Sequence, residues 1–231
     1  MKDFFKVSPL KILEGPAHKG LGKGNLGVLM AGAGLGKTSC LIDIALDRLF
    51  RGGKLVHVSL KDPPEKITSY YNVIFSDLVT VLGAENEHEV RDLIERNRII
   101  LAYLNESFDL ARLRENLNNL ANEIDFVPES LIVDGIDFAQ AKPELFEGFK
   151  RIAEDLQAEA WFSALTHQPL AEADEGGTSV AWNGVDAFFS VIIRLYSTES
   201  GVFLKLVKHH DSEQISEAVL RLDPDNFLVI G

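Results

Sequence analysis

The sequence predicts an α/β protein whose mostly parallel central sheet is covered by helices on both faces. Three observations support this: apolar runs that alternate with helical segments, the one-sided apolar pattern of those segments, and a change of pattern after residue 196. Buried parallel strands are continuous apolar runs, and helices usually connect them. The expected strands are LGVLMA (26–31), KLVHVSL (54–60), RIILAYL (98–104), SLIVDGI (130–136), AWFSALT (160–166) and FFSVIIRLY (188–196).

The segments between these runs place apolar residues three and four positions apart. This spacing forms one apolar stripe on a helix, as in helices that pack on a sheet, and indicates core packing rather than a cofactor site. The two clearest series are Leu110, Leu113, Leu117, Leu120 and Ile124, and then Leu145, Phe149, Ile152 and Leu156.

The chain after residue 196 has a different pattern. A turn-rich STESG is followed by VFLKLVKHH, AVLRL and FLVIG, short apolar runs separated by turn residues. Such runs are typical of antiparallel hairpins, here at the edge of the sheet. We therefore expect a single domain over residues 1–231, with a parallel core at 8–196 and C-terminal hairpins at 197–231.

The charge balance limits the partners. Lys and Arg number 23 against 35 Asp and Glu, which gives a net charge of -12. Such a field repels nucleic-acid backbones and anionic membranes unless a local basic patch exists. The single cysteine, the absence of a leader pattern and the absence of a long apolar run lead us to expect a cytoplasmic protein without a membrane segment. Cys40, His57, Tyr70 and Tyr71 are interpreted as packing residues.

The sequence AGAGLGKT (31–38) is a phosphate-binding loop pattern between an expected strand and an expected helix at 39–50. Glycines allow a tight backbone that directs N–H groups toward a phosphate, and the helix N-terminus adds partial positive charge. Lys37 would reach the β- and γ-phosphates and Thr38 would bind magnesium. The residues expected around the phosphates are Gly32, Ala33, Gly34, Leu35, Gly36, Lys37, Thr38 and Ser39.

A second pattern supports the first. SLIVDG is an apolar strand that ends in Asp134, which is suited to hold magnesium through water beside Thr38. A strand-terminal aspartate is common as a turn residue, but one that follows a phosphate loop in an alternating strand and helix pattern indicates a nucleotide site.

The chain resembles the RecA-like ATPases, within them the KaiC-like and DnaB-helicase-like branch. The resemblance spans the chain from about residue 8 to its end. The segments that support it are KGLGKGNLGVLMAGAGLGKTS (19–39), KLVHVSL (54–60), SLIVDGID (130–137), ALTHQ (164–168) and LKLVKHH (204–210). The resemblance implies ATP and Mg²⁺ as cofactors and a homo-oligomer or a protein partner.

The sequence departs from that family where water is activated. The strand that matches KLVHVSL ends in a catalytic glutamate in the family, whereas here the position is Lys61. A lysine ammonium has no acceptor lone pair, so it cannot orient water as a carboxylate does. Asp62 and Glu65 remain as candidate replacements, and a solvated strand end is the plain alternative.

Two other positions come from the resemblance. Gln168 would sense the γ-phosphate, or is an ordinary loop residue. Lys208 and His210 match a Lys-x-Arg pair that ring-forming members present to the nucleotide of a neighbouring subunit. Histidine lacks the guanidinium fork and is mostly neutral near pH 7, so this cation is weakened. His209 and His210 are adjacent on a strand and point to opposite faces, which argues against a metal site.

Nucleic acid is not an expected partner. The loop QPLAEADEGGTSVAWNG contains three acidic residues and no Lys or Arg, and DGIDFAQAKPELFEG contains one lysine. A groove that binds a phosphate backbone needs several cations, so these loops argue against a DNA-processing ATPase.

The sequence thus leads to one first hypothesis and three alternatives. The first is a protein that binds Mg-ATP as a conformational ligand in regulation or assembly, with slow or absent hydrolysis. The alternatives are a competent ATPase that uses Asp62 or Glu65, a phosphotransferase for a small acceptor, and a scaffold with an empty loop.

Overall fold

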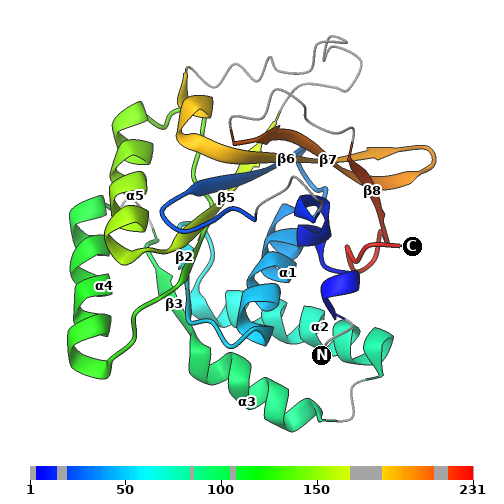
Figure 1. Ribbon diagram of the computed structural model, residues 1–231, viewed down its shortest axis with the longest axis horizontal. Coiled ribbons are helices and arrows are strands. Elements are labelled where there is room, and N and C mark those ends of the chain that lie inside the picture. Colours follow the sequence, from blue (N-terminus) through cyan, green and yellow to red (C-terminus); the bar gives the residue numbers. More distant parts are fainter. Residues whose placement is uncertain are drawn as a thin grey trace.

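The computed structural model describes residues 4–14, 20–83, 86–104, 108–166, 184–210 and 218–230. At its centre lies an eight-stranded sheet of order β3-β2-β4-β5-β1-β6-β7-β8 (Figure 1). The first six strands in the sequence are parallel, and the last two are antiparallel to their neighbours. The strands are β1 (Leu26–Ala31), β2 (Leu55–Ser59), β3 (Arg98–Ala102), β4 (Ser130–Asp134), β5 (Glu159–Leu165), β6 (Phe189–Thr198), β7 (Gly201–His209) and β8 (Val219–Leu222).

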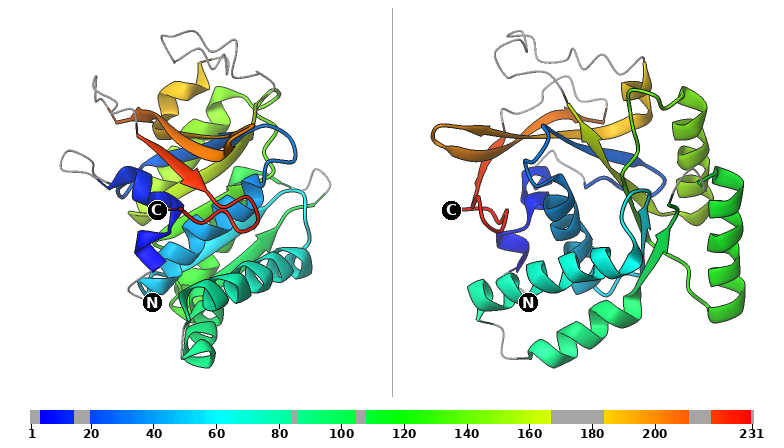
Figure 2. Two further views of the ribbon diagram at one scale, coloured as in Figure 1. Left: turned by 90° about the vertical axis from the view of Figure 1, so that its right-hand side faces the viewer. Right: turned by 180° about the vertical axis from the view of Figure 1, so that it is seen from behind.

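Helices cover both faces of this sheet. One face carries α1, α2 and α3, and the other carries α4 and α5 (Figures 1 and 2). The α-helices are α1 (Lys37–Phe50), α2 (Pro64–Leu82), α3 (Glu87–Asn97), α4 (Leu110–Ile124) and α5 (Pro143–Leu156), and the 3₁₀ turns are η1 (Phe4–Lys6), η2 (Pro9–Leu13) and η4 (Val185–Phe188). The predicted α/β class, the mostly parallel sheet and the antiparallel C-terminal strands are confirmed.

The predicted apolar stripe of α4 is only partly a core stripe. Asp109 caps the helix by accepting hydrogen bonds from the backbone N–H groups of its first turn, and Leu113 and Leu117 are buried against the sheet. Ile124, the last member of the series, is 60% exposed, because α4 ends there and Asp125 takes a left-handed conformation.

The last predicted apolar run, FLVIG, forms one bridge rather than a strand. Val229 pairs with Leu222, and the chain between them is turned back by Asp223, whose carboxylate accepts from the N–H groups of Asp225 and Asn226. The backbone N–H of Val229 donates to Val7 at 2.8 Å, which ties the C-terminal turn to the N-terminal segment.

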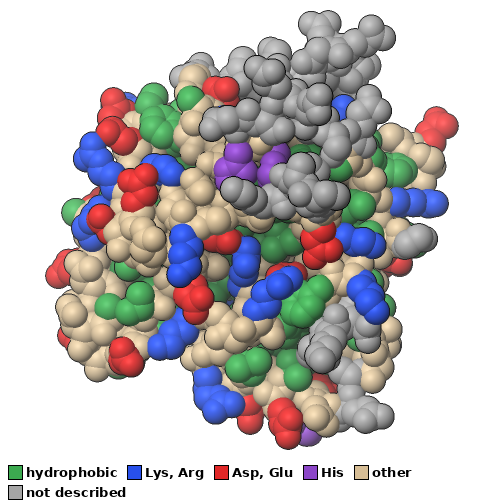
Figure 3. All heavy atoms as spheres, viewed as in Figure 1, with side chains coloured by type: hydrophobic (Ala, Val, Ile, Leu, Met, Phe, Trp, Pro, Cys, Tyr) green, Lys and Arg blue, Asp and Glu red, His purple; other side chains and the backbone are tan. Residues whose placement is uncertain are grey.

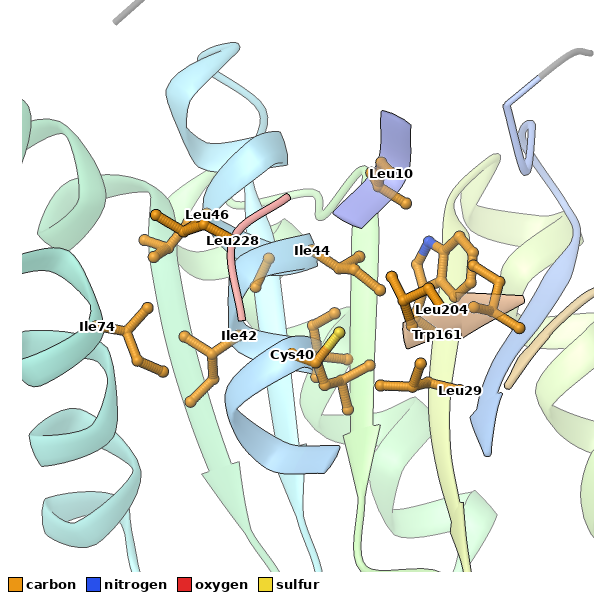
Figure 4. Close-up of a cluster of buried hydrophobic side chains, with 14 of the residues drawn as sticks. Leu10, Leu29, Cys40, Ile42, Ile44, Leu46, Ile74, Trp161, Leu204 and Leu228 are labelled. Carbon is orange, nitrogen blue, oxygen red and sulfur yellow. The ribbon is translucent and has the colours of Figure 1, made fainter. Parts of the chain in front are cut away.

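Helix α1 is the most enclosed helix of the core. It lies between the sheet and the layer of α2 and η2, and its residues from Cys40 to Leu46 are buried on every side (Figure 4). Burial raises the pKa of the Cys40 thiol well above its usual range, which confirms Cys40 as a packing residue. The enclosure fixes where the N-terminus of α1 meets the sheet.

Some buried polar groups in this layer lack hydrogen-bond partners among the described residues. Both carboxyl oxygens of Asp43 in α1 and the indole N–H of Trp161 in β5 are unpaired. Burial, followed by the nearby Asp77 carboxylate, raises the pKa of Asp43 well above its usual range, so the side chain is held neutral.

None of the helices in the described ranges combines the length and the apolar character that crossing a membrane would require.

Candidate functional site

The glycine-rich loop predicted to bind phosphate connects the end of β1 to the start of α1. Gly34 and Gly36 have φ angles of 75° and 77°, a left-handed conformation that glycine adopts without strain. Gly36 is the N-cap of α1, and no side chain caps the first turn. Ala33 and Gly34 are exposed, while Leu35 and Ser39 are half-buried. The loop therefore has the backbone that the sequence predicts, at the carboxyl edge of the parallel strands.

The aromatic ring of Phe227 lies directly against this loop. A Cβ added to Gly36 would come within 2.0 Å of a ring carbon of Phe227, so a side chain at this position would collide with the ring. Phe227 itself has a φ of 60°, which is uncommon for a bulky residue and shows that its position is imposed by the surrounding turn. The C-terminal segment thus packs against the glycine-rich loop.

Lys37 folds back over the loop. Its Nζ donates to the carbonyl oxygen of Gly32 at 2.9 Å and lies 3.4 Å from that of Ala31. Burial lowers the pKa of Lys37, the Asp134 carboxylate opposes this, and the positive charge of Lys61 lowers the pKa further. The ammonium is therefore held at the loop by weak neutral acceptors that an anion could replace.

Asp134 is joined to α1 and to β5. Its Oδ2 accepts a hydrogen bond from Thr38 Oγ1 at 2.8 Å, and its Oδ1 accepts one from the Ser163 hydroxyl. The register explains the second contact: Val133 pairs with Phe162, so Asp134 and Ser163 are the next residues along neighbouring strands. The predicted pair of Thr38 and Asp134 is thus brought together, and a serine fixes the carboxylate from the other side.

The carboxyl end of β2 has a different organisation. Ser59 Oγ donates to the carbonyl of Asp62 at 2.7 Å and accepts from the N–H of Asp62 at 3.1 Å, which closes a tight turn. The Asp62 carboxylate accepts from Lys66 Nζ at 2.7 Å. Glu65 is exposed in the first turn of α2. Asp62 is thus engaged in an ion pair at the start of a helix, and Glu65 faces solvent.

Lys61, at the position where the resemblance leads us to expect a glutamate, packs over the residue that follows Asp134. A Cβ added to Gly135 would lie 3.1 Å from Lys61 Cγ and 3.3 Å from Lys61 N. The N–H of Leu60 also donates to the Asp134 carbonyl at 2.9 Å. These contacts place the stem of Lys61 beside the Asp134 turn.

Lys208 and His210 lie toward the amino ends of the parallel strands, away from the loop. Lys208 in β7 pairs with Ile192 in β6, and Ile192 pairs with Val28, which is three residue steps of about 3.3 Å, or about 10 Å, before Ala31 at the end of β1. The N–H of His210 donates to the Ser190 carbonyl, still closer to the start of β6. Lys208 Nζ donates to the Asp186 carbonyl, and His210 Nε2 is 3.2 Å from the Gly20 carbonyl oxygen. Within one chain these residues are not part of the loop site.

Gln168, the expected γ-phosphate sensor, lies outside the described residues, as do the acidic residues of the loop that follows it. On the face seen in Figure 3, the described basic and acidic side chains are interspersed.

A buried polar cluster lies on β2 behind the site. His57 Nδ1 is 3.1 Å from the Tyr71 hydroxyl, and the Arg98 guanidinium lies over the Tyr71 ring at 4.2 Å. His57 Nε2 has no hydrogen-bond partner within the described part of the chain. Burial lowers the pKa of His57 to about 4, against the opposing charge of Asp134. The histidine is therefore neutral at physiological pH, and the prediction that His57 and Tyr71 pack in the core is confirmed.

The sequence reasoning missed two contributors to the site. Ser163 is a polar residue inside an apolar strand, and this is a signal that could have identified it. Phe227 carries no local signal, because its contact with Gly36 depends on how the C-terminal turn folds.

The donor set around Asp134 suits a hard divalent cation. A carboxylate and a hydroxyl that lie 2.8 Å apart at the end of a phosphate loop are oxygen ligands of the kind that magnesium prefers, with phosphate and water oxygens completing its shell. No group of three or more His, Cys, Asp and Glu side chains suited to a metal occurs in the described segments. A cation here would therefore depend on a bound phosphate.

Comparison with known proteins gives no family assignment: no protein-family model matches the chain, and no curated protein matches it.

Proposed function

We propose that this protein binds a magnesium complex of ATP as a conformational ligand in regulation or assembly, with slow or absent hydrolysis. The observation that supports this best is the hydrogen bond that Thr38, directly after a glycine-rich loop, donates to Asp134 at the end of β4. Two residues from separate segments meet where a phosphate loop needs its magnesium ligands.

The strand order supports the further proposal that the fold is RecA-like. The strand β5 lies between β1 and β4, so the loop after β1 and the aspartate after β4 share one edge of the sheet. Ligands of open α/β sheets bind at the carboxyl ends of the strands. The resemblance of the sequence to the KaiC-like and DnaB-helicase-like branch is the basis for naming ATP.

In this proposal the loop backbone and Lys37 hold the phosphates. The ammonium leaves the carbonyls of Ala31 and Gly32 for phosphate oxygens, which are stronger acceptors because they are charged. Thr38 and Asp134 hold magnesium, with Asp134 acting through water. The cation, when bound, neutralises phosphate charge.

Weak hydrolysis is proposed because of what stands at the end of β2. Lys61 cannot accept a proton from water, Asp62 is paired with Lys66, and Glu65 is exposed. A neighbouring subunit would present Lys208 and His210 from the side of its sheet where the parallel strands begin, and these side chains offer a weaker cation than an arginine. A homo-oligomer remains part of the proposal.

The binding experiment measures thermal unfolding with and without Mg-ATP. A ligand at 100 times its dissociation constant stabilises a fold by about 2.7 kcal/mol. We expect the wild type and Lys205→Ala, which removes an exposed lysine of β7, to show the shift, and Lys37→Ala to lose it. No shift for the wild type, or the same shift for Lys37→Ala, would contradict nucleotide binding at the loop.

A single-turnover assay separates slow hydrolysis from the competent ATPase. We expect negligible turnover by the wild type and a higher rate for Lys61→Glu, because that change restores a carboxylate at the strand end. Robust wild-type turnover that Asp62→Ala abolishes would favour the competent ATPase instead.

A further inference from the structure

Lys61 is a cation at the candidate site, and the described part of the chain shows no counter-ion for it. It is exposed, and the described residues provide no hydrogen-bond or ion-pair partner for its ammonium. The nearest acid in the sequence, Asp62, is paired with Lys66. The turn that closes on Ser59 and the packing of the stem over Gly135 fix where this lysine leaves the backbone.

Lys61 and Lys37 lie on two sides of the Asp134 turn. The stem of Lys61 packs over Gly135, and Thr38, the residue after Lys37, donates to the Asp134 carboxylate. The strands β4 and β5 lie between β2, which leads to Lys61, and β1, which leads to Lys37. The positive charge of Lys61 contributes to lowering the pKa of Lys37. Each carboxylate oxygen of Asp134 already accepts a hydrogen bond, one from Thr38 and the other from Ser163. Two lysines, Lys37 and Lys61, therefore flank the Asp134 turn.

The position of Lys61 indicates which phosphate it would meet. In the proposed site the loop and the start of α1 would hold a phosphate chain near β1, whereas Lys61 belongs to β2, beyond β5 and β4 in the sheet. A phosphate group that extends past the magnesium residue Asp134 would come between the two lysines. A diphosphate held by the same loop would end before it.

We propose that Lys61 is a second phosphate-binding cation, which contacts the terminal phosphate of a nucleoside triphosphate and makes the site select a triphosphate over a diphosphate. This rests on the proposed nucleotide site and assigns a function to the residue at the position where the resemblance leads us to expect a glutamate. The lysine gives the site a means to distinguish bound states of a nucleotide without cleaving it.

The test compares affinities for Mg-ADP and for the magnesium complex of a non-hydrolysable ATP analogue, by calorimetry. We expect the wild type to prefer the triphosphate. We expect Lys61→Gln to weaken triphosphate binding about tenfold and diphosphate binding by less than about twofold, because a charge-assisted hydrogen bond is lost only with the triphosphate. Lys61→Arg should retain most of the preference.

Lys142→Gln is the matched control. Lys142 is an exposed lysine at the same edge of the sheet, where α5 begins, and its loss changes the net charge equally. We expect it to leave both affinities within about twofold. A weakening by Lys142→Gln equal to that of Lys61→Gln would mean that general electrostatic attraction explains the effect.

The remaining outcomes separate this inference from the proposed function. If the wild type binds both nucleotides and Lys61→Gln weakens both equally or neither, the assignment of Lys61 is overturned while the nucleotide site stands. If the wild type binds neither nucleotide, the proposed function fails and the inference fails with it. Unfolding midpoints without nucleotide check that the variants fold.

Discussion

The two halves of the carboxyl edge of the sheet differ in how closely they follow the family that the sequence resembles. In the first half, the ends of β1, β4 and β5 bring together Lys37, Thr38 and Asp134 with a supporting Ser163. In the second half, the end of β2 presents Lys61 beside a carboxylate paired with Lys66. The first half has residues suited to hold phosphate and magnesium, and the second has a cation where a water-activating acid is expected.

Under the proposed function, nucleotide binding and nucleotide hydrolysis depend on different parts of this edge. A phosphate grip needs backbone N–H groups, a cation and a metal ligand, all held by a loop and two neighbouring strands. Hydrolysis needs one further carboxylate with a free lone pair facing the attacking water. In this proposal, a lysine in place of the acid at the end of β2 would remove hydrolysis and leave nucleotide binding intact.

The largest predicted effect comes from a change in the glycine-rich loop of the first half. Gly36→Ala should destabilise the fold by about 2–4 kcal/mol, because alanine is strained at a φ of 77° and its Cβ would collide with Phe227. Urea unfolding measures this. We also expect nucleotide binding to be lost, since the loop must shift.

Gly34→Ala is the matched control for that change. Its φ is 75°, but no atom lies within 4 Å of the added Cβ. We expect only the backbone strain, about 1–2 kcal/mol. Equal losses for the two variants would show that Phe227 does not support the loop, and Phe227→Ala should recover part of the Gly36→Ala loss if it does.

The next effect concerns the metal. Asp134→Asn keeps the shape of the side chain but removes its charge, and we expect Mg²⁺-dependent nucleotide affinity to fall about 10–100-fold. Titration of nucleotide binding with and without Mg²⁺ provides the measurement. Ser163→Ala, which removes only a supporting donor, should have a smaller effect; equal binding by Asp134→Asn and wild type would contradict the magnesium assignment.

Part of this comparison could be predicted from sequence. The glycine loop, Lys37 and Asp134 were predicted because each depends on a local pattern of strand, turn and helix. The contact of Ser163 with Asp134 depends on the register of two strands, and the contact of Phe227 with Gly36 depends on a turn at the far end of the chain. Such contacts follow from tertiary packing and leave little trace in a local pattern.

The same limit applies to the second half. The resemblance led us to expect an acid at the position of Lys61, and the sequence left Asp62 and Glu65 open as replacements. The ion pair of Asp62 with Lys66 is a local contact four residues apart, at the start of a helix. Its choice of partner could not be read from sequence, because Asp62 could equally have faced the edge of the sheet.

A pH experiment tests the buried His57 of β2, the strand whose end forms the second half. The pKa of His57 is about 4 in the fold, against 6.5 for an ordinary histidine, so the unfolded chain binds a proton first as pH falls. Neutral His57 therefore contributes fully to the free energy of unfolding above pH 6.5, and this contribution is lost as the pH falls from 6.5 to 4. Between pH 7 and pH 5 the free energy of unfolding should fall by about 2 kcal/mol. Asp134 and Arg98 act on this group in opposite directions.

Urea unfolding at pH 7 and pH 5 measures the loss, and His57→Gln is the comparison variant. We expect the variant to lose less stability than the wild type over this interval, since glutamine does not titrate. An equal pH dependence in both proteins would mean that His57 is not held neutral.

The smallest effect lies under the first half, with the opposite pH dependence. Asp43 in α1 is buried without hydrogen-bond partners among the described residues, and its pKa is raised by burial and by Asp77. A raised pKa in the fold means that the unfolded chain loses this proton first, so stability falls as pH rises above the ordinary value near 3.8.

Asp43→Asn removes this titration while it keeps the size of the side chain. We expect the variant to be more stable than the wild type at pH 7 by about 1–2 kcal/mol, and the difference to widen between pH 5 and pH 8. Urea unfolding across that range tests it, and a difference that stays constant from pH 5 to pH 8 would show that Asp43 is ionised in the fold. If the stability difference widens, the buried acid Asp43 lowers the stability of the helix that positions Lys37 and Thr38. Nucleotide affinity of the Asp43→Asn variant then tests whether binding depends on this acid.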